Sequence, residues 1–146
     1  MTDAAELARQ AAGELYSRDV AARALGIEIL AVDTGRATLA MRVRPDMLNG
    51  HAICHGGLIF ALADTAFAYA CNSYNENTLA ASAAIEFLAP AREGDLLTAT
   101  ASEQSRGRRL GLYDIEVSNQ QGTRIALFRG RSARVGGNVL AGAGDK

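Results

Sequence analysis

The stretch from Gly56 to Cys71 constrains the fold more than any other part of the sequence. Nearly all of its side chains are small or apolar, and no continuous polar face runs along them. A helix that is apolar on all sides needs packing partners all round, and this one is shorter than the roughly 18 residues of a membrane span. The stretch therefore predicts a central helix wrapped by other elements of a globular domain.

Asp64 is the one charged residue between Gly56 and Cys71. An unpaired buried carboxylate either takes up a proton or raises the free energy of the folded state. A structural Asp at this place would bond a neighbouring backbone or cap an adjoining element. A functional Asp would act as a base or nucleophile, because poor hydration makes a carboxylate more basic. We favour the functional interpretation.

Length and composition limit the remaining possibilities. The 146 residues suit one domain, and the net charge of −1 does not suggest nucleic acid or a membrane as a partner. The acidic N-terminus is unlike a signal peptide. Two cysteines, Cys54 and Cys71, do not make a disulfide framework. We therefore expect a protein of the reducing cytoplasm.

The pattern along the chain predicts one domain over residues 1–135 and a flexible, Gly/Ala-rich tail over 136–146. Asp3 and Glu6 form a capping pattern for a first short helix, and Ser17 or Asp19 would cap a second one that Gly26 ends. Strands are expected over residues 27–32, 37–43, 80–88, 95–103, 110–119 and 123–134.

This order of elements predicts an α+β domain in which one antiparallel sheet packs on the central helix. A single curved sheet covers about half of a helix. The rest would expose a large apolar patch, which soluble monomers avoid. The sequence therefore predicts a homo-oligomer in which a second subunit covers the rest of the helix.

Gly56 and Gly57 lie where the central helix begins. The N-terminus of a helix exposes free N–H groups and the positive end of the dipole, and glycine lets a substrate carbonyl come close to them. The alternative is a tight turn into the helix. Together with an acid in the same helix, the pair favours an oxyanion-binding role.

The spacing of Gly56 and Asp64 has a further consequence. Eight residues separate them in the sequence, which is about 12 Å along a helix axis. Reacting atoms need to approach to about 3–3.5 Å. We therefore predict a dimer with shared active sites, in which Gly56 of one chain faces Asp64 of the other.

Two other polar clusters have more than one interpretation. The run from Arg106 to Arg109 is either a solvated hairpin turn or a phosphate-binding segment, and we favour the second. His51, Cys54 and His55 resemble a metal cluster, but they lack a spaced carboxylate or a second Cys/His pair. No metal is expected.

Several motifs resemble those of the PaaI-type acyl-CoA thioesterases, which have the hot-dog fold. The motifs are Asn49-Gly-His-Ala-Ile-Cys-His-Gly-Gly, Leu62-Ala-Asp, Phe87-Leu-Ala-Pro and Gly111-Leu-Tyr-Asp, and the likeness runs over about residues 25–134. The resemblance implies a homotetramer of hot-dog dimers in phenylacetate catabolism. It also implies hydrolysis of phenylacetyl-CoA and its ring-hydroxylated forms, with CoA as part of the substrate and no separate cofactor.

The resemblance also implies roles for individual residues. Asp64 would activate water or attack directly, the Gly56 N–H would polarise the thioester carbonyl, and Asn49 and His55 would place substrate and water. His55 also has a structural alternative, which is to fix its loop. The CoA-binding segment would be formed by Ser105, Arg106, Gly107, Arg108, Arg109 and Leu110.

Ser82 and Phe87 are weaker candidates. Ser82 lies on the strand after the helix and is a candidate for orienting water, although the surrounding Ala-Ala-Ser-Ala-Ala departs from the family pattern. Four aromatic residues are candidates for an acyl pocket, and core packing explains them equally well: Phe60, Phe67, Tyr69 and Phe87.

Two other functions fit the same fold. A non-catalytic acyl-CoA sensor would be expected to carry a DNA-binding segment or to lack the acid. A hydratase would pair Asp64 with a His a few residues later, and none is present. A thioester hydrolase remains the leading prediction.

Overall fold

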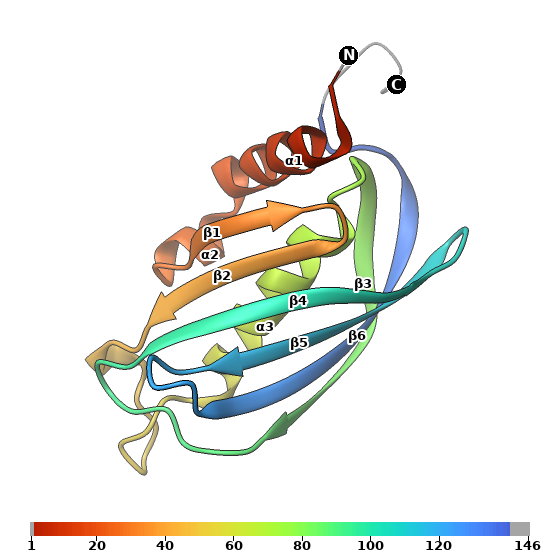
Figure 1. Ribbon diagram of the computed structural model, residues 1–146. Coiled ribbons are helices and arrows are strands. Elements are labelled where there is room, and N and C mark those ends of the chain that lie inside the picture. The colour runs from red at the N-terminus through yellow and green to blue at the C-terminus, as the bar shows by residue number, and fades with distance from the viewer. Residues whose placement is uncertain (1, 141–146) are drawn as a thin grey trace.

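The structure is a computed structural model that describes residues 2–140. Six antiparallel strands form one sheet in the order β1-β2-β4-β5-β6-β3, and the long helix α3 packs across one face (Figure 1). The predicted α+β layout is confirmed. The elements are α1 (Ala4–Arg18), α2 (Val20–Ala24), β1 (Glu28–Asp33), β2 (Arg36–Arg42), η1 (Pro45–Met47), α3 (Gly56–Cys71), β3 (Glu76–Phe87), β4 (Leu96–Arg106), β5 (Leu110–Ser118) and β6 (Arg124–Asn138).

The two N-terminal helices begin at capping residues, as the sequence predicts. The Asp3 carboxylate accepts a hydrogen bond from the Glu6 backbone N–H at 2.7 Å. Asp19, and not Ser17, caps α2, because its carboxylate accepts from the Ala22 N–H at 3.1 Å. The helix α1 packs against β1 at one edge of the sheet (Figure 1).

The core lies between α3 and the sheet. Phe67 on α3 contacts Tyr113 and Phe128 of the sheet, with ring centroids 5.6 and 5.9 Å apart. A side chain at Gly130 would come within 2.7 Å of the Phe67 ring, so only glycine allows the helix this close to the sheet. Phe67 and Tyr69 are fully buried, which makes them core residues rather than pocket residues.

The strands β3 and β6 are both longer than the sequence predicts. β3 begins at Glu76, four residues before the expected start, and pairs there with the last residues of β6. The buried Asn72 side chain stabilises this start, because its amide accepts from the Thr78 N–H and donates to the Thr78 carbonyl, both at 2.9 Å.

The tail predicted from residue 136 therefore starts too early. β6 continues to Asn138, and the Val139 side chain is buried. Arg18 donates to the Val139 carbonyl at 3.0 Å, and the Leu140 N–H donates to the Asn75 side chain at 2.8 Å. Residues 141–146 of the predicted tail lie outside the described part of the chain.

One side of α3 stays open in the single chain. The side facing the sheet is buried, whereas Leu58, Ala61, Asp64, Thr65 and Ala68 on the other side are only half-buried. Complete burial of the helix, expected from its sequence, is therefore not reached within one chain.

The strand β3 forms a free edge of the sheet. It is paired on one side only, with β6. Its residues from Leu79 to Leu88 are mostly exposed, including Leu79, Phe87 and Leu88, which are 61%, 52% and 51% exposed. Unpaired strand edges with apolar side chains favour pairing with another chain.

No helix within residues 2–140 is long and apolar enough to cross a membrane.

Candidate active site

Asp64 lies at the middle of α3 on its open side. Its carboxylate accepts no hydrogen bond from any residue between positions 2 and 140. Partial burial raises its pKa above the ordinary value of 3.8, and the negative charge of Asp19 raises it further. The side chain is therefore more basic than an exposed Asp, and it is available to a water molecule or a substrate.

The first turn of α3 provides a free N–H group at Gly56. His55 caps the helix: its Nδ1 accepts from the Gly57 N–H at 3.4 Å, and its carbonyl accepts from the Leu58 N–H at 2.9 Å. Within the described residues, the Gly56 N–H has no acceptor. It lies at the positive end of the helix dipole and is suited to bind an oxyanion.

His55 therefore has at least the structural role considered for it. Because Nδ1 accepts a hydrogen bond, the proton of the neutral imidazole is on Nε2, where it can still be donated outward. Gly57, a predicted substrate-binding residue, uses its N–H in this cap. Of the glycine pair, Gly56 is the one with a donor to offer.

Asn49 shapes the loop that precedes the helix. Its side-chain oxygen accepts from the backbone N–H groups of His51, at 2.8 Å, and Ile53, at 3.3 Å. The NH₂ of the same amide donates to no other described residue. The loop thus fixes Asn49 and leaves its two donors for a ligand.

A hollow of about 490 Å³ joins Gly56 to Asn49. Phe87 forms one wall, with its ring 3.0 Å from the position a Gly56 Cβ would take. The walls are mostly apolar, and the lining residues are Asn49, Ile53, Cys54, Gly56, Ile59, Phe87, Leu88, Ala89, Pro90 and Ala91. An apolar cavity with a few polar donors is typical of a small-molecule site.

Asp64 does not line this hollow. It lies eight residues along the same helix from Gly56, about 12 Å along the axis. The single chain therefore brings together Gly56, Asn49 and Phe87 but leaves the acid apart from them.

Ser82 faces the wrong way for its predicted role. It pairs with Arg131 across the β3–β6 ladder, so the two side chains lie on the same face of the sheet. The next residue to Arg131, Gly130, faces α3 and Phe67. Since neighbours along a strand alternate, Ser82 points away from α3, and the prediction that it orients water is wrong.

The segment Ser105–Leu110 forms the end of the β4–β5 hairpin. Arg106 lies 2.6 Å from the Glu76 carboxylate, with its guanidinium stacked 3.6 Å from the centre of the Tyr74 ring. Gly107 closes the turn by donating to the Leu110 carbonyl at 2.8 Å. Within the chain, Arg106 thus has a structural role that the sequence did not reveal.

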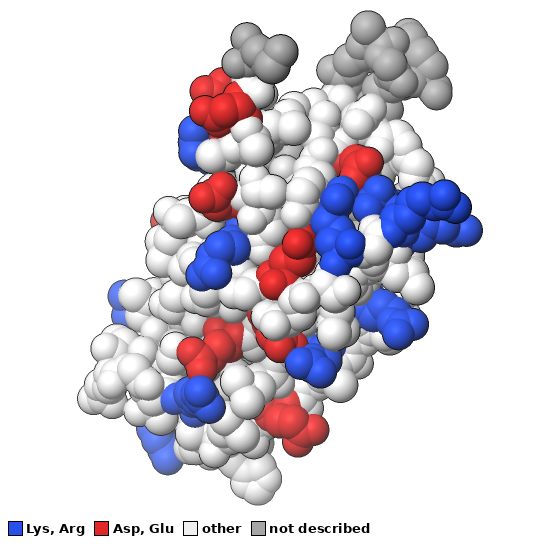
Figure 2. Space-filling model, turned by 45° about the vertical axis from the view of Figure 1, so that its right-hand side comes forward, with Lys and Arg blue, Asp and Glu red and all other residues white. Residues whose placement is uncertain are grey.

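Arg108 and Arg109 are different. Both are exposed, and neither side chain has an ion-pair partner within residues 2–140. Basic side chains gather on the side of the molecule from which this hairpin projects (Figures 1 and 2). These two arginines are therefore the free cations of the predicted phosphate-binding segment.

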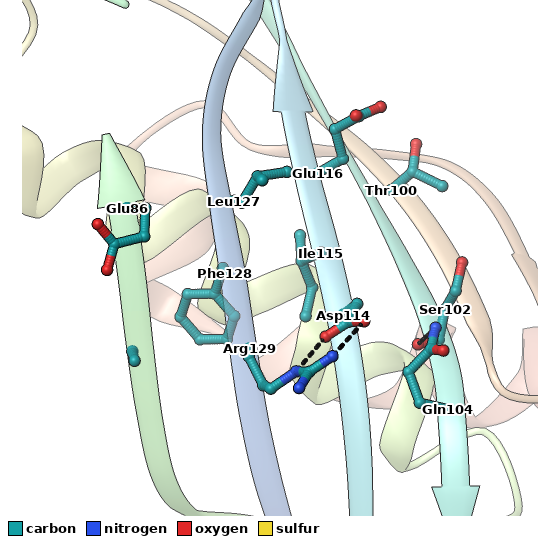
Figure 3. Close-up of a pocket in the computed structure, with 11 residues that line it drawn as sticks. Glu86, Thr100, Ser102, Gln104, Asp114, Ile115, Glu116, Leu127, Phe128 and Arg129 are labelled. Carbon is teal, nitrogen blue, oxygen red and sulfur yellow. Dashed lines mark hydrogen bonds and ion pairs between the residues drawn. The ribbon is translucent and has the colours of Figure 1, made fainter. Parts of the chain in front are cut away.

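A second hollow, of about 520 Å³, lies on the face of the sheet opposite α3 (Figure 3). Arg129 and Asp114 form a two-pronged ion pair there, at 2.7 and 2.9 Å. This pair lowers the pKa of Asp114. None of the residues singled out from the sequence lines this hollow, and it contains no basic carboxylate, so we place the chemistry at α3.

No group of three or more His, Cys, Asp or Glu side chains within residues 2–140 is arranged to hold a metal ion.

Known proteins share this geometry. Residues 51–126 match the model of the thioesterase superfamily. The chain is 51% identical over 134 residues to the acyl-coenzyme A thioesterase PaaI of Escherichia coli K12, covering 92% of this chain and 96% of that one.

Two solved structures are similar over most of the chain. The PaaI protein of the E. coli phenylacetic acid degradation operon superposes with a TM-score of 0.92 at 50% identity, over 93% of this chain and 99% of that one. A mutant of the phenylacetic acid degradation protein PaaI from Thermus thermophilus gives 0.75 at 37% identity, over 78% and 97%.

The family model covers more than half of the chain, and the structural likeness covers nearly all of it. The α+β layout, with a helix packed on a six-stranded antiparallel sheet, is the hot-dog arrangement that the resemblance implied. The chain is therefore a PaaI-type hot-dog protein of the thioesterase superfamily, a thioester hydrolase.

Proposed function

We propose that the protein hydrolyses phenylacetyl-CoA and ring-hydroxylated phenylacetyl-CoA to the free acid and CoA, in phenylacetate catabolism. The observation that carries the proposal is the pairing of a free Gly56 N–H with an apolar hollow walled by Phe87. The hollow offers an aryl group an apolar surface, and the N–H can polarise a thioester carbonyl. The 51% identity to an acyl-CoA thioesterase supports the substrate class.

The chemistry needs one base and one oxyanion donor. Asp64 takes a proton from water as the water oxygen attacks the thioester carbon, and the Gly56 N–H stabilises the oxyanion that forms. The C–S bond then breaks, CoA leaves as the thiol after protonation, and the acyl group leaves as the acid. In the alternative route, Asp64 attacks the carbonyl itself and water hydrolyses the resulting anhydride.

One turnover in ¹⁸O-labelled water separates the two routes. If water attacks the thioester, the product of the first turnover carries the label. If Asp64 attacks, and water then attacks the carboxylate carbon of the anhydride, the product carries unlabelled oxygen from Asp64 and the enzyme takes up the label.

We further propose that two chains build each site. A twofold pairing of the free β3 edges would place Phe87 of one chain beside the Glu76 end of the partner strand. Gly56 lies under Phe87, whereas the β4–β5 hairpin lies beside the start of β3, where Thr78 and Arg109 share a small pocket. The partner's hairpin would then face this chain's Gly56.

The same pairing covers the open side of α3 with the partner's helix. Antiparallel helices would bring each Gly56 toward the Asp64 of the other chain, which one chain cannot do. Arg108 and Arg109 of the partner's hairpin would bind the CoA phosphates while the carbonyl lies at Gly56. Two such dimers would form the tetramer that the resemblance implies.

The test is release of free thiol from phenylacetyl-CoA and from aliphatic acyl-CoAs. We expect release by the wild type, with preference for the aryl substrate. Asp64→Asn should lower the rate by about 10²–10⁴, whereas the control Asp33→Asn, in an exposed hairpin turn, should not. Tight binding of phenylacetyl-CoA without turnover would contradict the proposal and support the sensor.

A further inference from the structure

Asp19 lies at the junction of α1 and α2 with both carboxylate oxygens engaged. Oδ1 accepts from the Ala22 N–H at 3.1 Å and so caps α2. Oδ2 accepts from the Tyr69 hydroxyl at 2.9 Å. A carboxylate bound at both oxygens has one orientation, so its negative charge is fixed in space.

Tyr69 connects this charge to the central helix. It follows Asp64 by five residues on α3, about 7.5 Å along the axis, and it is only 2% exposed. Burial and the bond to Asp19 both raise the pKa of the Tyr69 hydroxyl. The hydroxyl therefore stays protonated at physiological pH and donates to a charged acceptor, which is a strong class of hydrogen bond.

Few other charges act on Asp64. Asp19 is the one charged group within residues 2–140 whose field raises the pKa of Asp64, in addition to burial, and no cation opposes it. On the same helix, burial raises the pKa of the Cys71 thiol to about 12, so that thiol is neutral. Around Tyr69, the ionisable neighbours besides Asp19 are Tyr16 and Arg23.

We propose that Asp19 and Tyr69 are a positioning pair for Asp64: Tyr69 holds the Asp19 carboxylate against α3, where its charge makes Asp64 a stronger base than burial alone would. This proposal rests on the proposed role of Asp64 as the base. It gives the N-terminal helices α1 and α2 a part in catalysis, although neither contains a reacting group.

A stronger base has a benefit and a cost. It removes a proton from water more readily, which raises the rate once it is ionised. It is also ionised only at higher pH, so activity is lost sooner as the pH falls. Removing the Asp19 charge should reverse both effects, and this crossing distinguishes an electrostatic role from a purely structural one.

The variant Asp19→Asn tests the proposal with little change in shape. Asn is also a good N-cap, and its side-chain oxygen can still accept from Tyr69. In pH profiles of kcat/KM with phenylacetyl-CoA, the acid limb should move to lower pH. The variant should be faster than the wild type below the wild-type midpoint, and equal or slower on the plateau.

Asp3→Asn is the matched control. Asp3 caps α1 through the same type of bond, to the Glu6 N–H, and does not act on Asp64. Its profile should overlay that of the wild type. An acid limb that stays in place in Asp19→Asn, while turnover is retained, would overturn the proposal.

A direct titration separates this proposal from the proposed function. The ¹³C shift of the Asp64 carboxyl, assigned with Asp64→Asn, reports its protonation whether or not the protein turns over the thioester. We expect a lower midpoint in Asp19→Asn, and in Asp19→Ser, a second neutral cap to use should Asp19→Asn fold poorly. Equal midpoints would overturn the pair even in an active enzyme, and absence of hydrolysis by the wild type would instead refute the proposed function.

Discussion

Gly56 can be tested at the level of a single atom, because its N–H is the group in question. It is the first residue of α3, a position where proline is well tolerated, and His55 before it has the extended backbone, φ −60° and ψ 131°, that a following proline needs. Gly56→Pro therefore removes the N–H with little cost to the helix.

Gly56→Pro should lower kcat by about 10²–10³, the usual effect of losing one oxyanion donor. The control is Gly56→Ala, which brings the same Cβ toward the Phe87 ring, 3.0 Å away, but keeps the donor. Steady-state kinetics of the two variants with phenylacetyl-CoA provide the comparison. Equal losses in both would show that bulk, and not the N–H, is what matters.

Asp64 should reduce the stability of the fold in which it acts. Its pKa in the folded chain is raised above the ordinary value of 3.8, so the folded state binds the proton more readily than the unfolded state. The free energy of unfolding should therefore fall as pH rises through the interval between these two pKa values, and stay low above it.

Asp64→Asn removes this titration. The inactive variant should be more stable than the wild type at neutral pH, with the difference shrinking as the pH is lowered toward 4. Urea unfolding of both proteins between pH 4 and 8 measures this. A variant less stable than the wild type at pH 7 would show that the carboxylate makes favourable contacts in the folded protein.

At the scale of elements, the β4–β5 hairpin separates two kinds of arginine. Arg109→Ala should raise KM for phenylacetyl-CoA by about tenfold, because it removes a charge-assisted bond to phosphate, and Arg108→Ala should act similarly. Added salt should reduce the difference from the wild type. Unchanged KM in both variants would argue against phosphate binding at this hairpin.

Arg106→Ala is the structural counterpart. Its ion pair with Glu76 and its stacking on Tyr74 are partly exposed to solvent, so together they are worth about 1 kcal/mol. We expect the free energy of unfolding to fall by about that amount, with KM unchanged. A raised KM at full stability would assign Arg106 to the substrate.

The elements that the sequence predicts correctly are those whose signal is local. The apolar run of α3 and the caps at Asp3 and Asp19 are examples. The start of β3 and the end of β6 were missed because each is polar or glycine-rich and becomes a strand only by pairing with the other. The direction of Ser82 depends on the strand register, which one segment does not encode.

The candidate site follows the same division. Asp64, Gly56 and Asn49 are recognisable from the sequence because they break an apolar or loop pattern. The bond between Asp19 and Tyr69 joins residues 50 positions apart, and no local pattern announces it. The attachment of Arg106 to Glu76 was hidden for the same reason.

At the scale of the whole molecule, mixed dimers test whether sites are shared. Asp64→Asn chains and Gly56→Pro chains are each expected to be inactive alone. In an equal mixture, half of the dimers are mixed and each has one intact site, so about a quarter of the wild-type activity should return. No recovery after verified exchange of subunits would mean that each site lies within one chain.

The bare outer edge of β3 also affects how activity depends on the amount of protein. If the second chain completes each site, dilution below the dimer dissociation constant would silence the enzyme by mass action, without any inhibitor and without unfolding. Specific activity would then climb with enzyme concentration before levelling off, and the melting temperature would climb with it.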